Sequence, residues 1–67
     1  MISANFVTVI KFLLKKGYTI EEYDWMTFLM DPQKEKVATI TKEQMEALKK
    51  SVMFFEVRDT NCICYSV

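Results

Sequence analysis

Histidine is absent from this 67-residue sequence, and glycine and proline occur once each. Without histidine, the chain lacks the commonest general base, the usual activator of a serine or cysteine nucleophile, and the commonest metal ligand. A single glycine also leaves no glycine-rich loop that could hold a phosphate group. These absences predict a protein that is not an enzyme and that binds no cofactor.

An excess of charge is also missing, because nine Lys and Arg residues balance nine Asp and Glu residues. Proteins that bind nucleic acid usually carry a basic excess, so this balance argues against a nucleic-acid partner. No apolar run approaches the roughly 20 residues that cross a bilayer, and the N-terminus lacks the features of a signal peptide. We therefore expect a soluble, cytoplasmic protein with no membrane partner, whose two cysteines stay reduced.

Hydrophobic residues make up 51% of the chain, which predicts one small globular domain over residues 1–67. Near the N-terminus, apolar residues recur at helical spacing between a candidate N-cap, Ser3, and Gly17, which suits the end of a helix. Phe12 falls on the polar side of this helix. We expect the next segment to cover Phe12, although a second packing surface or a partner is the alternative. The apolar stripe consists of Ile2, Phe6, Val9, Ile10, Leu13 and Leu14.

Residues 18–41 are predicted to form a long β-hairpin around a turn at Asp31-Pro32. The proline ring presets φ for such a turn, and the aspartate side chain caps it. Before the turn, aromatic and β-branched residues favour a strand. A capping box from Thr19 to Glu22 would instead begin a helix, and the strand is the preferred interpretation.

Alternation within the first arm of this hairpin predicts three residues that face the core: Met26, Phe28 and Met30. The same parity would bury Glu22 and Asp24, which no core accepts unpaired. We therefore expect either a β-bulge near Trp25 or a strand end that overhangs the core. Either arrangement leaves part of the Tyr23 and Trp25 side chains near solvent.

A capping box from Thr41 to Gln44 predicts the start of a second helix. Two further strands are predicted over residues 53–58 and 62–67, joined by a turn over residues 59–61. One shared apolar face is expected for Met53, Phe55, Val57, Ile63, Tyr65 and Val67. The order α-β-β-α-β-β predicts an α+β fold in which two helices pack on one face of an antiparallel sheet of about four strands. The last strand is expected to have an open edge, and a homodimer paired there is weighed equally with a monomer.

Acidic and aromatic residues gather in the first arm of the hairpin. Trp and Tyr often carry interface energy, and acidic neighbours suit a basic groove on a partner. The alternative is an ordinary core tryptophan beneath a helix. The predicted partner-binding residues are Glu21, Glu22, Tyr23, Asp24 and Trp25.

Cys62 and Cys64 lie two residues apart, which puts both thiols on one face of a strand. A closed zinc site needs four ligands, and the chain has no histidine or further cysteine to complete one. We therefore interpret these cysteines as packed thiols and predict no metal site.

Three short segments resemble parts of MarR-type winged-helix regulators. Residues 14–17 resemble the end of a recognition helix, residues 31–37 a wing turn, and residues 40–43 the start of the following helix. The resemblance implies a DNA-binding transcriptional regulator. The arm before the turn, however, carries acidic residues where DNA phosphates would require Arg or Lys.

The sequence therefore leaves two candidate functions. The preferred one is a small protein-protein interaction module, of the kind that phages and mobile elements encode as inhibitors of host proteins. The alternative is a nucleic-acid-associated regulator that gathers Lys11, Lys15, Lys16, Lys49 and Lys50 on one side of a dimer.

Overall fold

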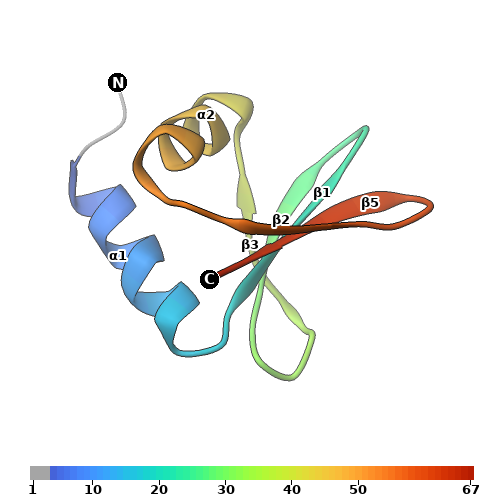
Figure 1. Cartoon of the computed structure of the whole chain (residues 1–67), viewed down its shortest axis with the longest axis horizontal. Helices are drawn as coiled ribbons and strands as arrows, with labels where there is room; N and C mark the ends of the chain where they lie inside the picture. The colour runs from blue at the N-terminus through green and yellow to red at the C-terminus, as the bar shows by residue number, and fades with distance from the viewer. Residues whose placement is uncertain (1–3) are drawn as a thin grey trace.

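The computed structural model describes residues 4–67, which contain two helices and one five-stranded antiparallel sheet (Figure 1). The elements are α1 (Ala4–Lys15), β1 (Thr19–Tyr23), β2 (Thr27–Met30), β3 (Lys36–Ile40), α2 (Lys42–Ser51), β4 (Phe55–Arg58) and β5 (Cys62–Ser66). In the sheet, the strands lie in the order β3-β2-β1-β5-β4. The predicted α+β class is confirmed. The predicted order is not, since three strands rather than two separate the helices.

The first arm of the predicted hairpin is two strands, because the chain reverses at Asp24-Trp25. The Tyr23 N–H donates to the Met26 carbonyl at 2.8 Å, and Glu22 lies opposite Thr27. This reversal resolves the conflict that one continuous strand would create between acidic and apolar residues on one face. The competing helix at Thr19 does not form, because β1 begins there.

The reversal also changes which residues of β2 face the helices. Leu29 lies opposite Ile20 and joins the main core, whereas Phe28 lies opposite Glu21 on the other face of the sheet. The prediction that Met26, Phe28 and Met30 face the core is therefore wrong. Phe28 and Met30 are nevertheless buried, and Met26 is exposed.

The predicted turn at Asp31 is confirmed. The Asp31 carboxylate accepts from the N–H groups of Gln33 and Glu35, both at 2.9 Å. Lys34 takes a positive φ of 69° in this turn, which leads into β3. The local hydrogen bonds of one side chain thus fix the connection between β2 and β3.

Both helices carry the end signals that the sequence predicts. Gly17 has φ 99°, and the Tyr18 N–H donates to the Leu13 carbonyl, as in a Schellman C-cap. At the start of α2, the Gln44 N–H donates to Thr41 Oγ1, and the Thr41 N–H donates to Gln44 Oε1, both at 3.0 Å. The predicted capping box is confirmed. Ser3, the predicted N-cap of α1, lies outside the described residues.

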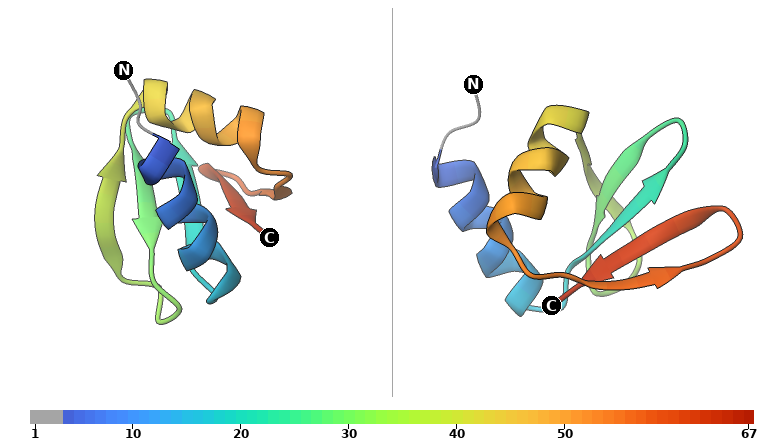
Figure 2. Two further views of the ribbon diagram at one scale, coloured as in Figure 1. Left: turned by 90° about the vertical axis from the view of Figure 1, so that its left-hand side faces the viewer. Right: turned by 45° about the horizontal axis from the view of Figure 1, so that its top comes forward.

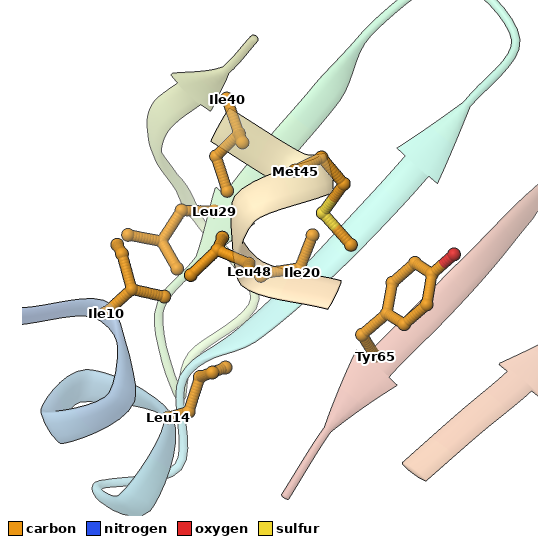
Figure 3. Packing of buried hydrophobic residues seen from close by; sticks show 8 residues of the cluster. All are labelled: Ile10, Leu14, Ile20, Leu29, Ile40, Met45, Leu48 and Tyr65. Carbon is orange, nitrogen blue, oxygen red and sulfur yellow. The ribbon is translucent and has the colours of Figure 1, made fainter. Parts of the chain in front are cut away.

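One face of the sheet carries the main core, and both helices lie on that side (Figure 2). We call it the covered face and the opposite side the open face. Residues from α1, β1, β2, β3, α2 and β5 meet in the core (Figure 3), and they are Ile10, Leu14, Ile20, Leu29, Ile40, Met45, Leu48 and Tyr65. Phe12 lies outside this core with 58% of its surface exposed, so the expected cover over Phe12 is absent. Neither helix within residues 4–67 has the length and apolar character that a membrane crossing requires.

The β4–β5 hairpin pairs one residue out of the predicted register. Its turn contains two residues, since the Asp59 N–H donates to the Cys62 carbonyl at 2.8 Å. A slip of one residue moves a side chain to the other face, so Val57 lies opposite Cys64 instead of beside Tyr65. The expected shared apolar face is therefore wrong. The predicted open edge on the last strand is also wrong, because β5 lies between β1 and β4.

Candidate functional site

Two hairpin ends project in the same direction from the sheet, one joining β1 to β2 and the other joining β4 to β5 (Figure 1). An open cleft of about 920 Å³ lies between them. Its walls are residues 22–27 and 58–63, and residues 40–42 at the start of α2 also contribute. Four of the five predicted binding residues line this cleft, namely Glu22, Tyr23, Asp24 and Trp25.

Trp25 is the most prominent side chain at this cleft, with 68% of its surface exposed. Its ring centroid lies 5.6 Å from the ring centroids of both Tyr23 and Phe28. Phe28 is only 8% exposed, and Lys36 Nζ lies 4.1 Å from its ring centroid. Phe28 therefore forms a fixed base that supports the indole while most of Trp25 stays open to solvent. The alternative of a core tryptophan beneath a helix is wrong.

Tyr23 is held in place by its neighbour on the open face. Its hydroxyl donates to Glu21 Oε1 at 2.8 Å, and this hydrogen bond, with partial burial, raises the pKa of Tyr23 to about 12. Glu21 does not line the cleft. Glu21 therefore acts on the cleft only through Tyr23, because this hydrogen bond helps to fix the orientation of the tyrosine side chain.

Glu22 points to the covered face and joins β1 to β5 and α2. Its Oε1 accepts from the Tyr65 hydroxyl at 2.6 Å, and its Oε2 lies 3.6 Å from Lys49 Nζ. Burial of Tyr65, together with this hydrogen bond, raises the pKa of the Tyr65 phenol. Glu22 thus lines the cleft and also holds β1, β5 and α2 together.

The charged side chains around the cleft are of both signs. Asp24 and Asp59 lie on opposite walls, and Arg58 and Lys42 also line it. A groove for a nucleic-acid backbone is typically lined by positive charge, whereas this cleft carries both signs.

The second wall, residues 58–63, was not predicted as part of a site. Strand pairing between β1 and β5 brings it beside Tyr23, and no local motif marks that contact. The signal that the sequence does contain is the predicted turn over residues 59–61, at the end of the β4–β5 hairpin.

Both cysteines lie on β5 and face the open side of the sheet, and Cys62 is part of this wall. Cys62 is opposite Tyr23, and Cys64 is opposite Glu21. Both are free thiols, and burial raises the pKa of Cys64. Among the described residues, no group of three or more His, Cys, Asp or Glu side chains could hold a metal ion.

The helices of residues 4–67 are separated by three strands, so they do not form the adjacent pair of a helix-turn-helix. The resemblance to winged-helix regulators is therefore limited to the turn between β2 and β3 and the cap of α2. Comparison with known proteins found no matching family model, no matching curated protein and no matching solved structure.

Proposed function

We propose that this protein is a non-enzymatic module that binds another protein through the Trp25 end of the β1–β2 hairpin. The observation that supports this most directly is the exposure of Trp25 on a base of packed aromatic rings. A large aromatic side chain held in one position loses little freedom on binding, which is why such residues dominate many interfaces.

The chemistry of the partner follows from the neighbours of Trp25. Asp24 is exposed beside the indole, and Glu21 lies on the adjacent strand. The complementary surface would be an apolar pocket with a basic rim, and a groove built for nucleic acid has such a rim. An inhibitor of a host nucleic-acid-binding protein, as phages and mobile elements encode, fits this description.

The alternative regulator would need its lysines free and gathered on one surface. Lys49 is instead paired with Glu22, and the projecting hairpin end carries acidic residues. These placements favour a protein partner over DNA, and we expect no salt-sensitive shift of a DNA duplex at sub-micromolar protein.

Capture from the source cell with wild type, Trp25→Ala and Phe12→Ala tests the proposal. Phe12 is a matched control because it is also an exposed aromatic residue, on α1 away from the cleft. We expect Trp25→Ala to abolish capture of the partner and Phe12→Ala to retain it, while both variants keep the wild-type circular dichroism spectrum. Anchors of this type typically cost about 2 kcal/mol or more of binding energy when truncated.

A second variant tests the role of charge. Asp24→Lys should slow association with the captured partner, most clearly at low salt, and should leave dissociation nearly unchanged. Equal capture by wild type and Trp25→Ala would contradict the proposal. Unfolding of Trp25→Ala would show that the Trp25 side chain is needed for stability, and its assignment as a binding residue would then be wrong.

A further inference from the structure

The β4 strand is one edge of the sheet and carries exposed apolar side chains. Phe55 is 72% exposed and Val57 is 59% exposed. Both lie on the open face, since Phe55 is opposite Ser66 and Val57 is opposite Cys64. An edge strand of this kind can pair with another strand.

The hydrogen-bond alternation of the β4–β5 hairpin shows which backbone groups are directed outward. The Asp59 N–H donates to the Cys62 carbonyl, so Asp59 and Cys62 belong to a hydrogen-bonded pair. In antiparallel pairing such pairs alternate along the strand, which directs the groups of Val57 toward β5 and those of Glu56 and Arg58 away from it. The outward groups thus belong to two residues of opposite charge.

We propose that a second copy of this chain pairs antiparallel with β4 about a twofold axis at Val57. In this register, Glu56 of each copy lies opposite Arg58 of the other copy. Because both residues direct their N–H and C=O groups outward, the two pairs exchange four backbone hydrogen bonds. Their side chains share the covered face as pairs of opposite charge.

The same register brings apolar surface together on the open face. Val57 meets Val57 of the second copy at the axis, and Phe55 lies diagonal to it, within reach of an aromatic side chain. The register therefore covers Val57 with its counterpart and pairs Glu56 with Arg58, while Phe55 lies opposite Asp59 of the second copy. The result is a ten-stranded sheet shared by two copies.

Other registers of β4 lack this complementarity. An axis at Glu56 places the two Glu56 side chains opposite one another, and an axis at Arg58 does the same for the two arginines. Like charges directly opposite in a sheet are destabilising. A register shifted by one residue would set the apolar face of one copy against the charged face of the other.

The other edge strand, β3, is a poorer site for self-pairing. Its pairing with β2 is irregular between Leu29 and Met30, and exposed Lys36 begins it. Bulges and edge lysines are devices that discourage strand addition. No acidic residue lies within Lys36–Ile40, so β3 offers no pairing of opposite charges.

Charge reversal on β4 tests the proposal by sedimentation equilibrium at tens of micromolar. Wild type should reach twice the 7.9 kDa chain mass. Glu56→Arg and Arg58→Glu should each weaken self-association about tenfold or more, because each places like charges opposite one another. Mixed in equal amounts, the two variants should associate, since every pair across the axis is then Arg against Glu.

The double variant Glu56→Arg with Arg58→Glu should also restore the homodimer. Glu46→Arg, an exposed reversal on α2, is the matched control and should leave association unchanged. A wild type that stays monomeric, or a dimer that neither single reversal weakens, would overturn the proposal. If neither the equal mixture nor the double variant associates, the proposed register is wrong. Trp25→Ala should dimerise normally, which separates this interface from the proposed partner site.

Discussion

Two tyrosine–glutamate pairs lie on opposite faces of the same sheet, and they differ in what surrounds them. On the covered face, Tyr65 is 2% exposed, and its hydroxyl joins Glu22 across two strands and beneath α2. On the open face, the Tyr23 hydroxyl joins Glu21, two residues away on the same strand. The first pair ties together distant segments, whereas the second only orients a side chain beside the cleft.

This difference indicates that the two faces of the sheet have different roles, one in stability and the other in binding. The covered face carries the main core and the bond that joins β5 to β1. The open face carries the aromatic base of Trp25 and the apolar residues of the β4 edge. Changes to the core residues of the covered face should therefore lower stability, whereas changes to Trp25 and to the exposed apolar residues of β4 should lower binding.

The largest effect is expected from the covered face. Leu48 is fully buried between α2 and the sheet, so Leu48→Ala should lower the free energy of unfolding by about 2–5 kcal/mol. Val37, exposed on β3, is the control, and Val37→Ala should change stability by less than about 0.5 kcal/mol. Urea titration of both variants measures this contrast. Equal losses would show that the two positions do not differ as their burial indicates.

Local signals in the sequence predicted local features well. The side chains of Asp31 and Thr41 bond to backbone groups within four residues, and Gly17 takes a backbone angle that other residues avoid. Each of these depends on a short stretch of chain. The turn at Asp31, the cap of α2 and the end of α1 were therefore predictable.

Features decided by packing between strands were not predictable in the same way. The reversal at Asp24-Trp25 contains no glycine, proline or Asn-Gly pair, and it forms where Leu29 can meet Ile20 in the core. The one-residue slip of β4 against β5 likewise buries Tyr65 and leaves Val57 exposed. Both depend on packing in the core, where Ile20, Leu29 and Tyr65 meet residues of α1 and α2.

The candidate site shows the same division. Residues 22–25 were predicted together because they are adjacent in the sequence, and they do line one cleft. The opposite wall, residues 58–63, comes from a strand paired across the sheet. Glu21 and Glu22 were both predicted as binding residues, and strand alternation alone places them on opposite faces of the sheet. Only the structure shows that Glu22 lines the cleft and that Glu21 does not.

A double-mutant cycle should measure the difference between the two tyrosine–glutamate pairs. Tyr65→Phe and Glu22→Gln should show a coupling energy of about 1–2 kcal/mol, because the bond is short, charged and screened from solvent on the tyrosine side. Tyr23→Phe and Glu21→Gln should couple by less than about 0.5 kcal/mol, since that bond joins neighbours on one strand. Denaturant midpoints of the singles and doubles give both values. A larger coupling on the open face would reverse the comparison.

The smallest expected effect is a loss of stability in alkaline solution. An unfolded tyrosine ionises near pH 10, whereas the hydrogen bond to Glu21 raises the pKa of Tyr23 to about 12, and burial raises the pKa of Tyr65. Above pH 10, the unfolded state therefore releases protons that the folded state keeps, so the free energy of unfolding falls as pH rises. Below pH 10 both states hold these protons, and the two tyrosines contribute no slope.

The same titration separates the two faces. Tyr65→Phe should flatten the decline in stability between about pH 10 and pH 12 more than Tyr23→Phe does. Burial is the main cause that raises the pKa of Tyr65, whereas for the less buried Tyr23 burial is secondary to the hydrogen bond. Thermal melts of wild type and the two variants across this range measure the slopes. If Tyr23→Phe flattens the decline in stability more than Tyr65→Phe does, ionisation of Tyr23 is the more strongly opposed in the folded state, which contradicts the prediction.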